Sequence, residues 1–268
     1  TLRRQVRFET FIADNSEAHV VTGPAYWGIA GHPISHSLTP RLFELVGRHV
    51  GIEGPEAVFI DADGIEEFMS KVTKMEGDVW LSCTAPLKHS PQDRLGVSGP
   101  EGVNAINQLK RIDGEWSGTS TDGAGFVDSC RHVGVEPSES TLRMRGGGSA
   151  ARSIAAAWSE AGGRISTVAG RRELVDGPWA DSIVEGGDAD IAIDLDAIPG
   201  GGESIDLRAK IQVSISYGDG ASFEEFAVKM VAAQHLEAWR VLFAPDKSEE
   251  LPTLSLLLEL LGAGSKDA

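Results

Sequence analysis

A glycine-rich turn is the first feature of this sequence whose residue types and spacing could do chemistry. Gly146, Gly148 and Ala151 form the pattern Gly-x-Gly-x-x-Ala between a strand-like segment and a helical one. In dinucleotide-binding proteins, such glycines let backbone N–H groups approach a pyrophosphate at the N-terminus of a helix. The alternative is an ordinary loop, but the flanking pattern of strand, helix and second strand favours the nucleotide interpretation. The residues expected to bind the cofactor here are Gly146, Gly147, Gly148, Ser149 and Ala150.

A pair of arginines follows at the place where such proteins choose between NAD and NADP. Arg171 and Arg172 come after Gly170, at the end of the next strand-like segment. NAD sites usually present a carboxylate here, whereas the planar fork of an arginine suits a 2′-phosphate. The pair could also be solvated surface arginines, and Glu173 stands beside it. We favour NADP, with Arg171 and Arg172 as its ligands.

The elements that position these residues alternate between strand and helix patterns, which predicts an α/β fold. The glycine-rich turn lies in a βαβ unit of strand 141–145, helix 150–161 and strand 164–169. A turn at Asp113-Gly114 predicts a hairpin within residues 105–121. The remaining expected elements are strands at 26–31, 57–61, 79–83, 190–195 and 210–216, and a helix after Pro40.

The C-terminal part of the chain has helical patterns. Ser222 and Glu225 form a capping box, which predicts a helix from near Phe223. A leucine-rich stretch, residues 254–261, predicts another helix that ends at Gly262. We expect two domains: an N-terminal α/β substrate domain and a Rossmann-like NADP-binding domain, with the C-terminal helices returning to the first. The expected ranges are residues 1–121 with 228–268, and residues 122–227.

Composition limits the class of protein. The 268 residues carry 24 Lys+Arg against 40 Asp+Glu, a net charge of −16, which argues against nucleic-acid or anionic-membrane partners. Neither an apolar run of about 18 residues nor a signal-peptide core is present. Two cysteines, Cys83 and Cys130, exclude a disulfide framework, and the histidines lack metal-site spacing. We expect a soluble, cytoplasmic protein without a metal, monomeric or homodimeric, that acts on a small molecule.

Several motifs, taken together and in order, resemble the shikimate dehydrogenase family. The resemblance extends roughly from Trp27 to Arg172 and includes the glycine-rich turn. It implies NADPH-dependent, reversible reduction of 3-dehydroshikimate to shikimate in aromatic amino-acid biosynthesis, with quinate as another substrate of some members. The other motifs are GHPISHSLTP (31–40), SCTAPLK (82–88), GVNAI (102–106) and STDG (120–123).

The resemblance also implies a catalytic pair, Lys88 and Asp122. Lys88 would protonate or hydrogen-bond the developing alkoxide, and Asp122 would orient the hydroxyl and hold Lys88 charged. Without the surrounding motifs, Lys88 would be interpreted as an exposed loop lysine. Asp122 would then be interpreted as the cap of a helix that starts near Gly123.

The implied substrate contacts are hydroxyl and amide side chains. Ser37 and Thr39 match the hydroxyl pair that binds the carboxylate, although Thr39 before Pro40 is also a good helix cap. Threonine at this second place is frequent among quinate users, so the choice between shikimate and quinate stays open. The implied substrate-binding residues are Ser37, Thr39, Thr84, Asn104, Tyr217 and Gln234.

The cofactor half departs from the family pattern. Residues 194–198 (DLDAI) replace an Asn-Ala-Thr-Ser-like segment, and Arg145 stands where an aliphatic residue is usual. The segment between Tyr217 and Gln234 is too short for the usual helix, strand and Asp-Gly loop. Two hypotheses follow. We prefer a dehydrogenase with a shortened cofactor domain, because Lys88 and Asp122 are retained. The alternative is a shikimate- or quinate-binding relative with weak or lost activity, acting as a regulatory or interaction domain.

Overall fold

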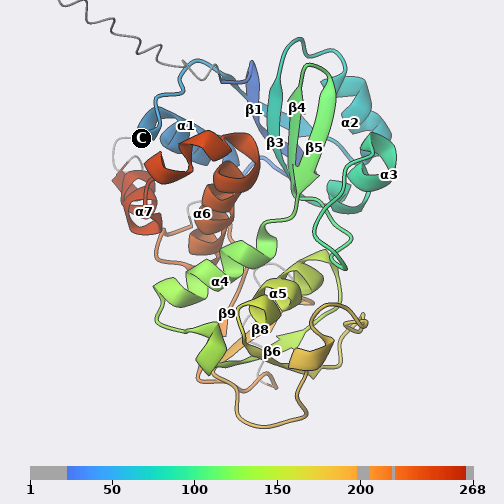
Figure 1. Cartoon of the computed structure of the whole chain (residues 1–268), viewed down its shortest axis with the longest axis vertical. Coiled ribbons are helices and arrows are strands. Elements are labelled where there is room, and N and C mark those ends of the chain that lie inside the picture. Colours follow the sequence, from blue (N-terminus) through green and yellow to red (C-terminus); the bar gives the residue numbers. More distant parts are fainter. Residues whose placement is uncertain (1–22, 198–205, 219–220, 264–268) are drawn as a thin grey trace, which may run out of the picture.

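Two lobes, each built around its own β-sheet, make up the molecule (Figure 1). The structure is a computed structural model that describes residues 23–197, 206–218 and 221–263. Sheet A has five strands in the order β2-β1-β3-β4-β5, and sheet B has four in the order β7-β6-β8-β9. The expected α/β architecture, with a Rossmann-like second lobe and C-terminal helices that return to the first, is confirmed.

Sheet A is a mixed sheet. Strand β1 (Tyr26–Gly31) pairs in parallel with β2 (Glu56–Asp61) and with β3 (Val79–Cys83). The antiparallel hairpin of β4 (Gln108–Ile112) and β5 (Glu115–Thr119) completes it. Asp113 and Gly114, at the tip of this hairpin, both have positive φ, as a two-residue turn of this twist requires. The hairpin prediction is therefore confirmed.

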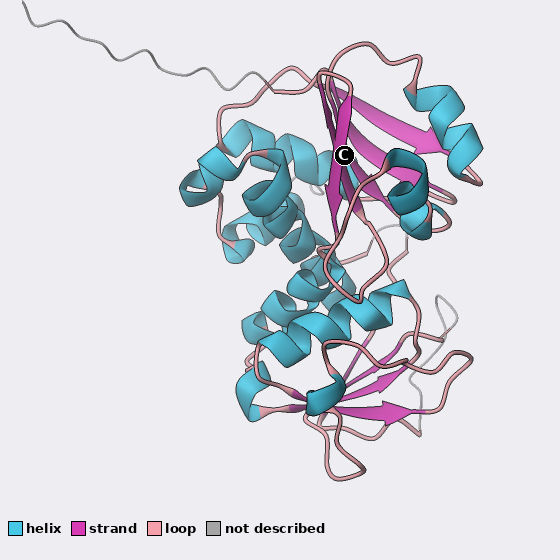
Figure 2. Cartoon of the chain, turned by 45° about the vertical axis from the view of Figure 1, so that its right-hand side comes forward, coloured by secondary structure: helices cyan, strands magenta, loops and turns pink. Residues whose placement is uncertain are grey.

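Helices cover both sides of sheet A (Figures 1 and 2). On one side α1 (Thr39–His49), α6 (Phe226–Ala238) and α7 (Leu254–Ala263) enclose an aromatic core around Trp27, Phe43 and Trp239. On the other side lie α2 (Ile65–Val72) and the short α3 (Pro91–Leu95). Among the described residues, no helix combines the length and the apolar character needed to cross a membrane.

Sheet B is all-parallel and covered unequally. Its strands are β6 (Thr141–Arg145), β7 (Arg164–Val168), β8 (Ile191–Asp194) and β9 (Ile211–Val213). Helices α4 (Asp122–His132) and α5 (Ser149–Glu160) pack on one face, whereas loops cross the other (Figure 2). The α5 crossover connects β6 to β7, as the βαβ pattern predicts. Between β7 and β8 the chain forms only a 3₁₀ turn, Ala180–Ser182.

Helix α4 packs against a helix of each lobe, and two glycines make this close packing possible. A Cβ on Gly123 would lie 1.9 Å from the carbonyl oxygen of Ser153 in α5. A Cβ on Gly125 would lie 2.5 Å from the Cβ of Gln234 in α6. Glycine at these two positions therefore permits α4 to pack closely against one helix of each lobe. The expected domain limits fall at the first residue of α4 and inside α6, and that division stays a prediction.

One predicted helix start is wrong, and one residue considered as a helix cap is not a cap. Helix α6 begins at Phe226 rather than near Phe223, whose side chain is 39% exposed. Ser222 and Glu225 do bond to each other, with the Ser222 N–H 2.9 Å from a carboxylate oxygen, but they form a turn before the helix. Thr39 is not the cap of α1 but its first residue.

Candidate active site

A cavity of about 560 Å³ lies between the two lobes, and we call it the first cavity. The carboxyl ends of β1 and β3, the first residue of α4 and one side of α6 contribute to its walls. All the predicted substrate-binding and catalytic residues except Asn104 line this cavity, although they come from separate elements and loops. The predicted residues that line it are Ser37, Thr39, Thr84, Lys88, Asp122, Tyr217 and Gln234.

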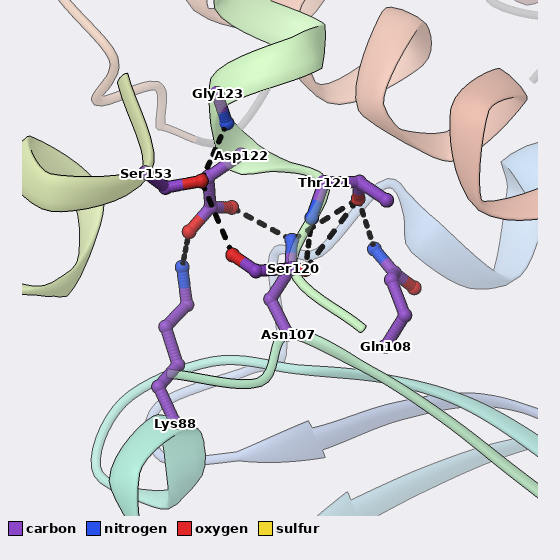
Figure 3. A network of polar contacts seen from close by, with 8 residues as sticks. All are labelled: Lys88, Asn107, Gln108, Ser120, Thr121, Asp122, Gly123 and Ser153. Carbon is purple, nitrogen blue, oxygen red and sulfur yellow. Dashed lines mark hydrogen bonds and ion pairs between the residues drawn. The ribbon is translucent and has the colours of Figure 1, made fainter. Parts of the chain in front are cut away.

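Lys88 and Asp122 form a close ion pair in this cavity. Lys88 lies on a 3₁₀ turn that follows β3, and its Nζ is 2.5 Å from Oδ2 of Asp122 (Figure 3). The side chains are only 19% and 5% exposed, so the alternative of an exposed loop lysine is wrong. Asp122 is the first residue of α4 and makes no side-chain cap there. Its carboxylate is instead available to hold the ammonium group.

Asn107, which the sequence analysis did not single out, binds the other oxygen of Asp122. Its Nδ2 lies 2.7 Å from Oδ1 of Asp122, and its Oδ1 accepts the backbone N–H of Thr121 at 2.7 Å. These two bonds fix which end of the amide is which. The signal that could have found it is the second asparagine of the segment GVNAIN. Asn107 lines the first cavity.

Asn104 lies elsewhere. It is not among the residues that line the first cavity, and its backbone is in the left-handed region at φ 49°. Its carbonyl oxygen accepts hydrogen bonds from His89 Nδ1 at 3.1 Å and from the Arg152 guanidinium at 3.4 Å. Asn104 therefore forms the corner of a loop, and the predicted contact with a ring hydroxyl has no support from its position.

Three hydroxyl groups meet at one end of the first cavity, and we call them the hydroxyl cluster (Ser37, Thr39 and Tyr217). Ser37 Oγ accepts the Thr39 N–H at 3.3 Å, and Tyr217 Oη accepts the Leu38 N–H at 3.4 Å. Burial raises the pKa of Tyr217, so this phenol keeps its proton at neutral pH. Such a group of hydroxyls can donate hydrogen bonds to a carboxylate.

A second cavity, of about 380 Å³, lies at the glycine-rich turn. It adjoins the first cavity, because Ala150 lines both. Helix α5 starts here, and within the described residues no side chain caps it, so its first N–H groups can meet an anion. The residues that line the second cavity are Gly148, Ser149, Ala150, Ala151, Arg171, Arg172, Leu195 and Asp196.

The other two glycines of the turn shape it without lining the cavity. Gly146 has φ 113°, a conformation that side-chain-bearing residues rarely adopt. A Cβ on Gly147 would lie 2.0 Å from the carbonyl oxygen of Glu173. The turn therefore packs against the loop that carries the arginine pair, and the donor set fits a dinucleotide: backbone N–H groups beside two guanidinium groups.

A carboxylate shares the second cavity with the arginines. Asp196 Oδ2 accepts the backbone N–H of Arg171 at 2.5 Å, and Asp196 Oδ1 lies 3.5 Å from Arg171 Nε. Asp196 belongs to the segment that departs from the family pattern. The structure therefore places a negative charge where a 2′-phosphate would approach, although the charge is partly neutralised by Arg171.

Arg145, the unusual charge at the end of β6, is paired. Its Nη1 lies 2.9 Å from Oδ2 of Asp194 on the adjacent strand β8, and its Nη2 contacts Asp206. Asp194 in turn accepts the N–H of Asp196 at 3.0 Å. The two departures from the family pattern, Arg145 and Asp194, thus compensate each other.

Neither a thiol nucleophile nor a metal centre is indicated in the described ranges. Burial raises the pKa of Cys83 to about 12, which leaves its thiol protonated and packed beside the cavity. Across the same part of the chain, no cluster of three or more histidine, cysteine, aspartate or glutamate side chains could hold a metal ion.

The fold and the site define a two-domain α/β protein with a Rossmann-like lobe and a buried lysine–aspartate pair between the lobes. No family model matches the chain. It is 36% identical over 146 residues to the shikimate dehydrogenase (NADP(+)) of Xanthomonas campestris pv. campestris strain B100. The aligned region covers 51% of this chain and 49% of that protein. It is 33% identical over 131 residues to the enzyme of that name from Syntrophomonas wolfei, 48% of this chain and 44% of the other. The chain spans about half the length of the curated relatives it matches.

Solved structures show the same fold over most of the chain. One is shikimate 5-dehydrogenase from Thermus thermophilus in complex with NADP(H) and shikimate, with a TM-score of 0.68, 20% identity, and coverage of 87% of this chain and 97% of that one. Another is an Ael1 enzyme from Pseudomonas putida, with a TM-score of 0.67, 19% identity, and coverage of 88% and 97%. The resemblance of the chain to the shikimate dehydrogenase family is confirmed.

Proposed function

We propose that the protein is an NADP-dependent, shikimate dehydrogenase-like oxidoreductase that reversibly reduces 3-dehydroshikimate to shikimate in aromatic amino-acid biosynthesis. The observation that carries the proposal is the Lys88–Asp122 pair, held at 2.5 Å in a cavity that adjoins the second cavity through Ala150. The names of the curated relatives support the same reaction.

The substrate would bind with its carboxylate at the hydroxyl cluster. Ser37, Thr39 and Tyr217 supply donors there without a cation, which suits a small anion held by oriented hydroxyls. Thr84 and Gln234 line the remaining walls and can bond ring hydroxyls in either direction. We include quinate as a second candidate substrate, because Thr39 stands at the place where quinate users often carry threonine.

Lys88 would serve as the proton donor. When bound at the second cavity, NADPH would supply the hydride for the carbonyl carbon. Lys88 Nζ would donate a hydrogen bond and then a proton to the carbonyl oxygen, where negative charge would develop. Asp122 keeps the ammonium group oriented, and Asn107 keeps Asp122 oriented. In the reverse direction Lys88 accepts the hydroxyl proton.

The second cavity would hold the dinucleotide. The uncapped start of α5 would face the pyrophosphate, and Arg171 with Arg172 would face the 2′-phosphate. The residues present fit such a ligand, and Asp196 would set how strongly the phosphate is preferred. A cytoplasmic location, a monomeric or homodimeric state and the lack of a nucleic-acid partner are parts of this proposal.

The test measures reduction of the nicotinamide through its absorbance, using shikimate and NADP+. Quinate and NAD+ serve as crossed controls for the substrate and the cofactor. We expect reduction that needs both shikimate and NADP+ and that vanishes in Asp122→Asn. No reduction, with shikimate still bound in calorimetry, would contradict the proposal and favour a shikimate-binding protein with a regulatory or interaction role.

A further inference from the structure

Two consecutive residues of α5 reach toward the Lys88–Asp122 pair. Helix α5 begins at the second cavity, and Arg152 and Ser153 follow its first turn. Neither belongs to the residues that line the first cavity. Ser153 contacts the residue next to Asp122 (Figure 3), whereas Arg152 contacts the loop whose Ile106 N–H bonds to the Lys88 carbonyl. Their contacts are of different kinds and are described in turn.

Ser153 contacts residues on both sides of Asp122: the backbone of Gly123 and the side chain of Ser120. Its Oγ accepts the N–H of Gly123 at 2.8 Å and lies 3.1 Å from Oγ of Ser120. The Gly123 N–H is one of the first donors of α4, which no residue of α4 can satisfy. Ser153 is itself buried, so water does not replace its hydroxyl readily. The turn that presents Asp122 is therefore fixed from α5 as well as from Asn107.

Arg152 holds the loop that supports Lys88. Its Nε donates to the carbonyl of Val103 at 2.7 Å and its Nη2 to that of Asn104 at 3.4 Å, while Nη1 donates to Gly147 in the glycine-rich turn at 3.1 Å. The same loop returns to Lys88, since the Ile106 N–H donates to the Lys88 carbonyl at 2.8 Å. One guanidinium group thus joins the glycine-rich turn of one lobe to a loop of the other lobe, and that loop bonds to the Lys88 backbone.

We propose that Arg152 and Ser153 are positioning residues for the reaction: α5 sets the geometry of the Lys88–Asp122 pair from the cofactor side. This inference rests on the proposed function for its effect on turnover, but not for the geometry itself. The single ammonium nitrogen of lysine cannot reach the three carbonyls that the planar fork of Arg152 reaches, and alanine lacks the hydroxyl acceptor of Ser153. Losing either contact lets one member of the pair move.

The first experiment uses the protein alone. Lys88 acetylation by acetic anhydride is timed by mass spectrometry, with exposed Lys74 as internal reference. We expect Ser153→Ala and Arg152→Lys to raise the Lys88 rate several-fold, because a looser ion pair exposes the amine. One matched control is Ser159→Ala, which lies on the same helix and loses a hydroxyl contact with Ser182. The other is Arg143→Lys, which loses contacts to backbone carbonyls away from the site. Equal rates in all variants would overturn the proposal.

The second experiment measures turnover of shikimate and NADP+. We expect kcat to fall roughly ten- to a hundredfold in Ser153→Ala and Arg152→Lys, with KM for shikimate within a few-fold, and the controls to stay near wild type. A raised KM with unchanged kcat would contradict a positioning role. If the wild-type chain does not turn over at all, the proposed function fails, while the acetylation rates still decide whether α5 positions the pair.

Discussion

At the scale of single residues, the carboxylate of Asp122 is held at both oxygens. Oδ2 of Asp122 meets Lys88 and Oδ1 meets Asn107, so rotation of the carboxylate would break one contact or the other. The proposed reduction of a ketone requires a proton donor at a fixed position, and these two contacts would keep Lys88 in place for it. We therefore expect Asn107, which follows the family-like motif, to contribute more to the proposed reaction than Asn104 inside the motif.

The two asparagines can be tested against each other. Asn107→Ala removes the partner of Asp122 Oδ1, and we expect kcat/KM to fall by roughly ten- to a hundredfold. Asn104→Gly keeps the left-handed backbone of its loop corner, and we expect kcat/KM within a few-fold of wild type. Steady-state kinetics of both variants decides. A larger loss in Asn104→Gly would show that the loop closes onto the substrate during the reaction.

The arginine pair can be tested through the two nicotinamide cofactors. The double variant Arg171→Ala, Arg172→Ala should lower the affinity for NADPH roughly ten- to a hundredfold and the affinity for NADH far less, because only NADPH has the 2′-phosphate. Asp196→Asn should raise the affinity for NADPH, since it removes the negative charge beside Arg171. Cofactor fluorescence titrations measure both. Equal losses for NADPH and NADH in the double variant would refute the phosphate assignment.

The sequence predicts seven of the residues that line the first cavity, but not the residues that support them. Lys88 and Asp122 carry recognisable chemistry, whereas Ser153 and Asn107 accept backbone N–H groups far away in the sequence, and Asn107 also donates to the Asp122 carboxylate. Such partners depend on how α4 crosses α5, which no local pattern contains. The motif around Asn104 implies a ring contact, but the position of its side chain cannot be obtained from spacing alone.

At the scale of elements, an ion pair connects the carboxyl ends of strands β6 and β8 in sheet B, where apolar packing would be usual. Arg145 at the end of β6 and Asp194 at the end of β8 are 17% and 12% exposed and lie 2.9 Å apart. Their face of the sheet is covered by loops, and Arg143, on the same face, donates to two loop carbonyls. A face without a helix admits charged side chains that a doubly covered sheet would not.

The ion pair between Arg145 and Asp194 gives a stability prediction. Arg145→Met removes the ion pair between Arg145 and Asp194, and we expect the free energy of unfolding to fall by about 1 to 3 kcal/mol in urea titrations. Arg143→Met, which breaks contacts to backbone carbonyls and not to a carboxylate, should cost less. Adding Asp194→Asn to Arg145→Met should recover part of the loss, because asparagine keeps the acceptor for Asp196. No recovery would mean that the pair contributes little.

Elements are easier to predict than their ends. Period and turn residues locate every strand of both sheets within a few residues, since burial imposes those patterns. The predicted start of α6 is misplaced because Ser222 and Glu225 make the bonds of a capping box in a turn that stops short of the helix. Phe223 is partly exposed in that turn, so its apolar character does not mark a buried helix face.

At the scale of the whole molecule, stability depends on pH through a histidine of the first lobe. His235 in α6 is fully enclosed; its Nε2 accepts the Trp239 indole N–H at 3.0 Å, and the ring also bonds the backbone of Leu42. Burial lowers the pKa of His235 from 6.5 to about 3. The folded protein therefore keeps this ring neutral where the unfolded chain is protonated.

The sign of the effect follows from proton uptake. Between about pH 6.5 and 3 the unfolded chain binds one more proton at this histidine, so unfolding becomes easier as pH falls, by about 1.4 kcal/mol per pH unit from this group. Urea unfolding from pH 7 to 4 should show a steeper loss in the wild type than in His235→Gln. Identical slopes in the two proteins would contradict this assignment.

The aromatic core around Trp239 has an optical consequence. The Trp239 ring lies 5.4 Å from that of Trp80 and 6.3 Å from that of Trp27, whereas Trp158 and Trp179 are buried in the other lobe. Indoles this close share their electronic excitation, and their coupled transitions give paired bands in circular dichroism. The first lobe thus carries its own spectroscopic signature, so its loosening can be followed separately from events around the glycine-rich turn.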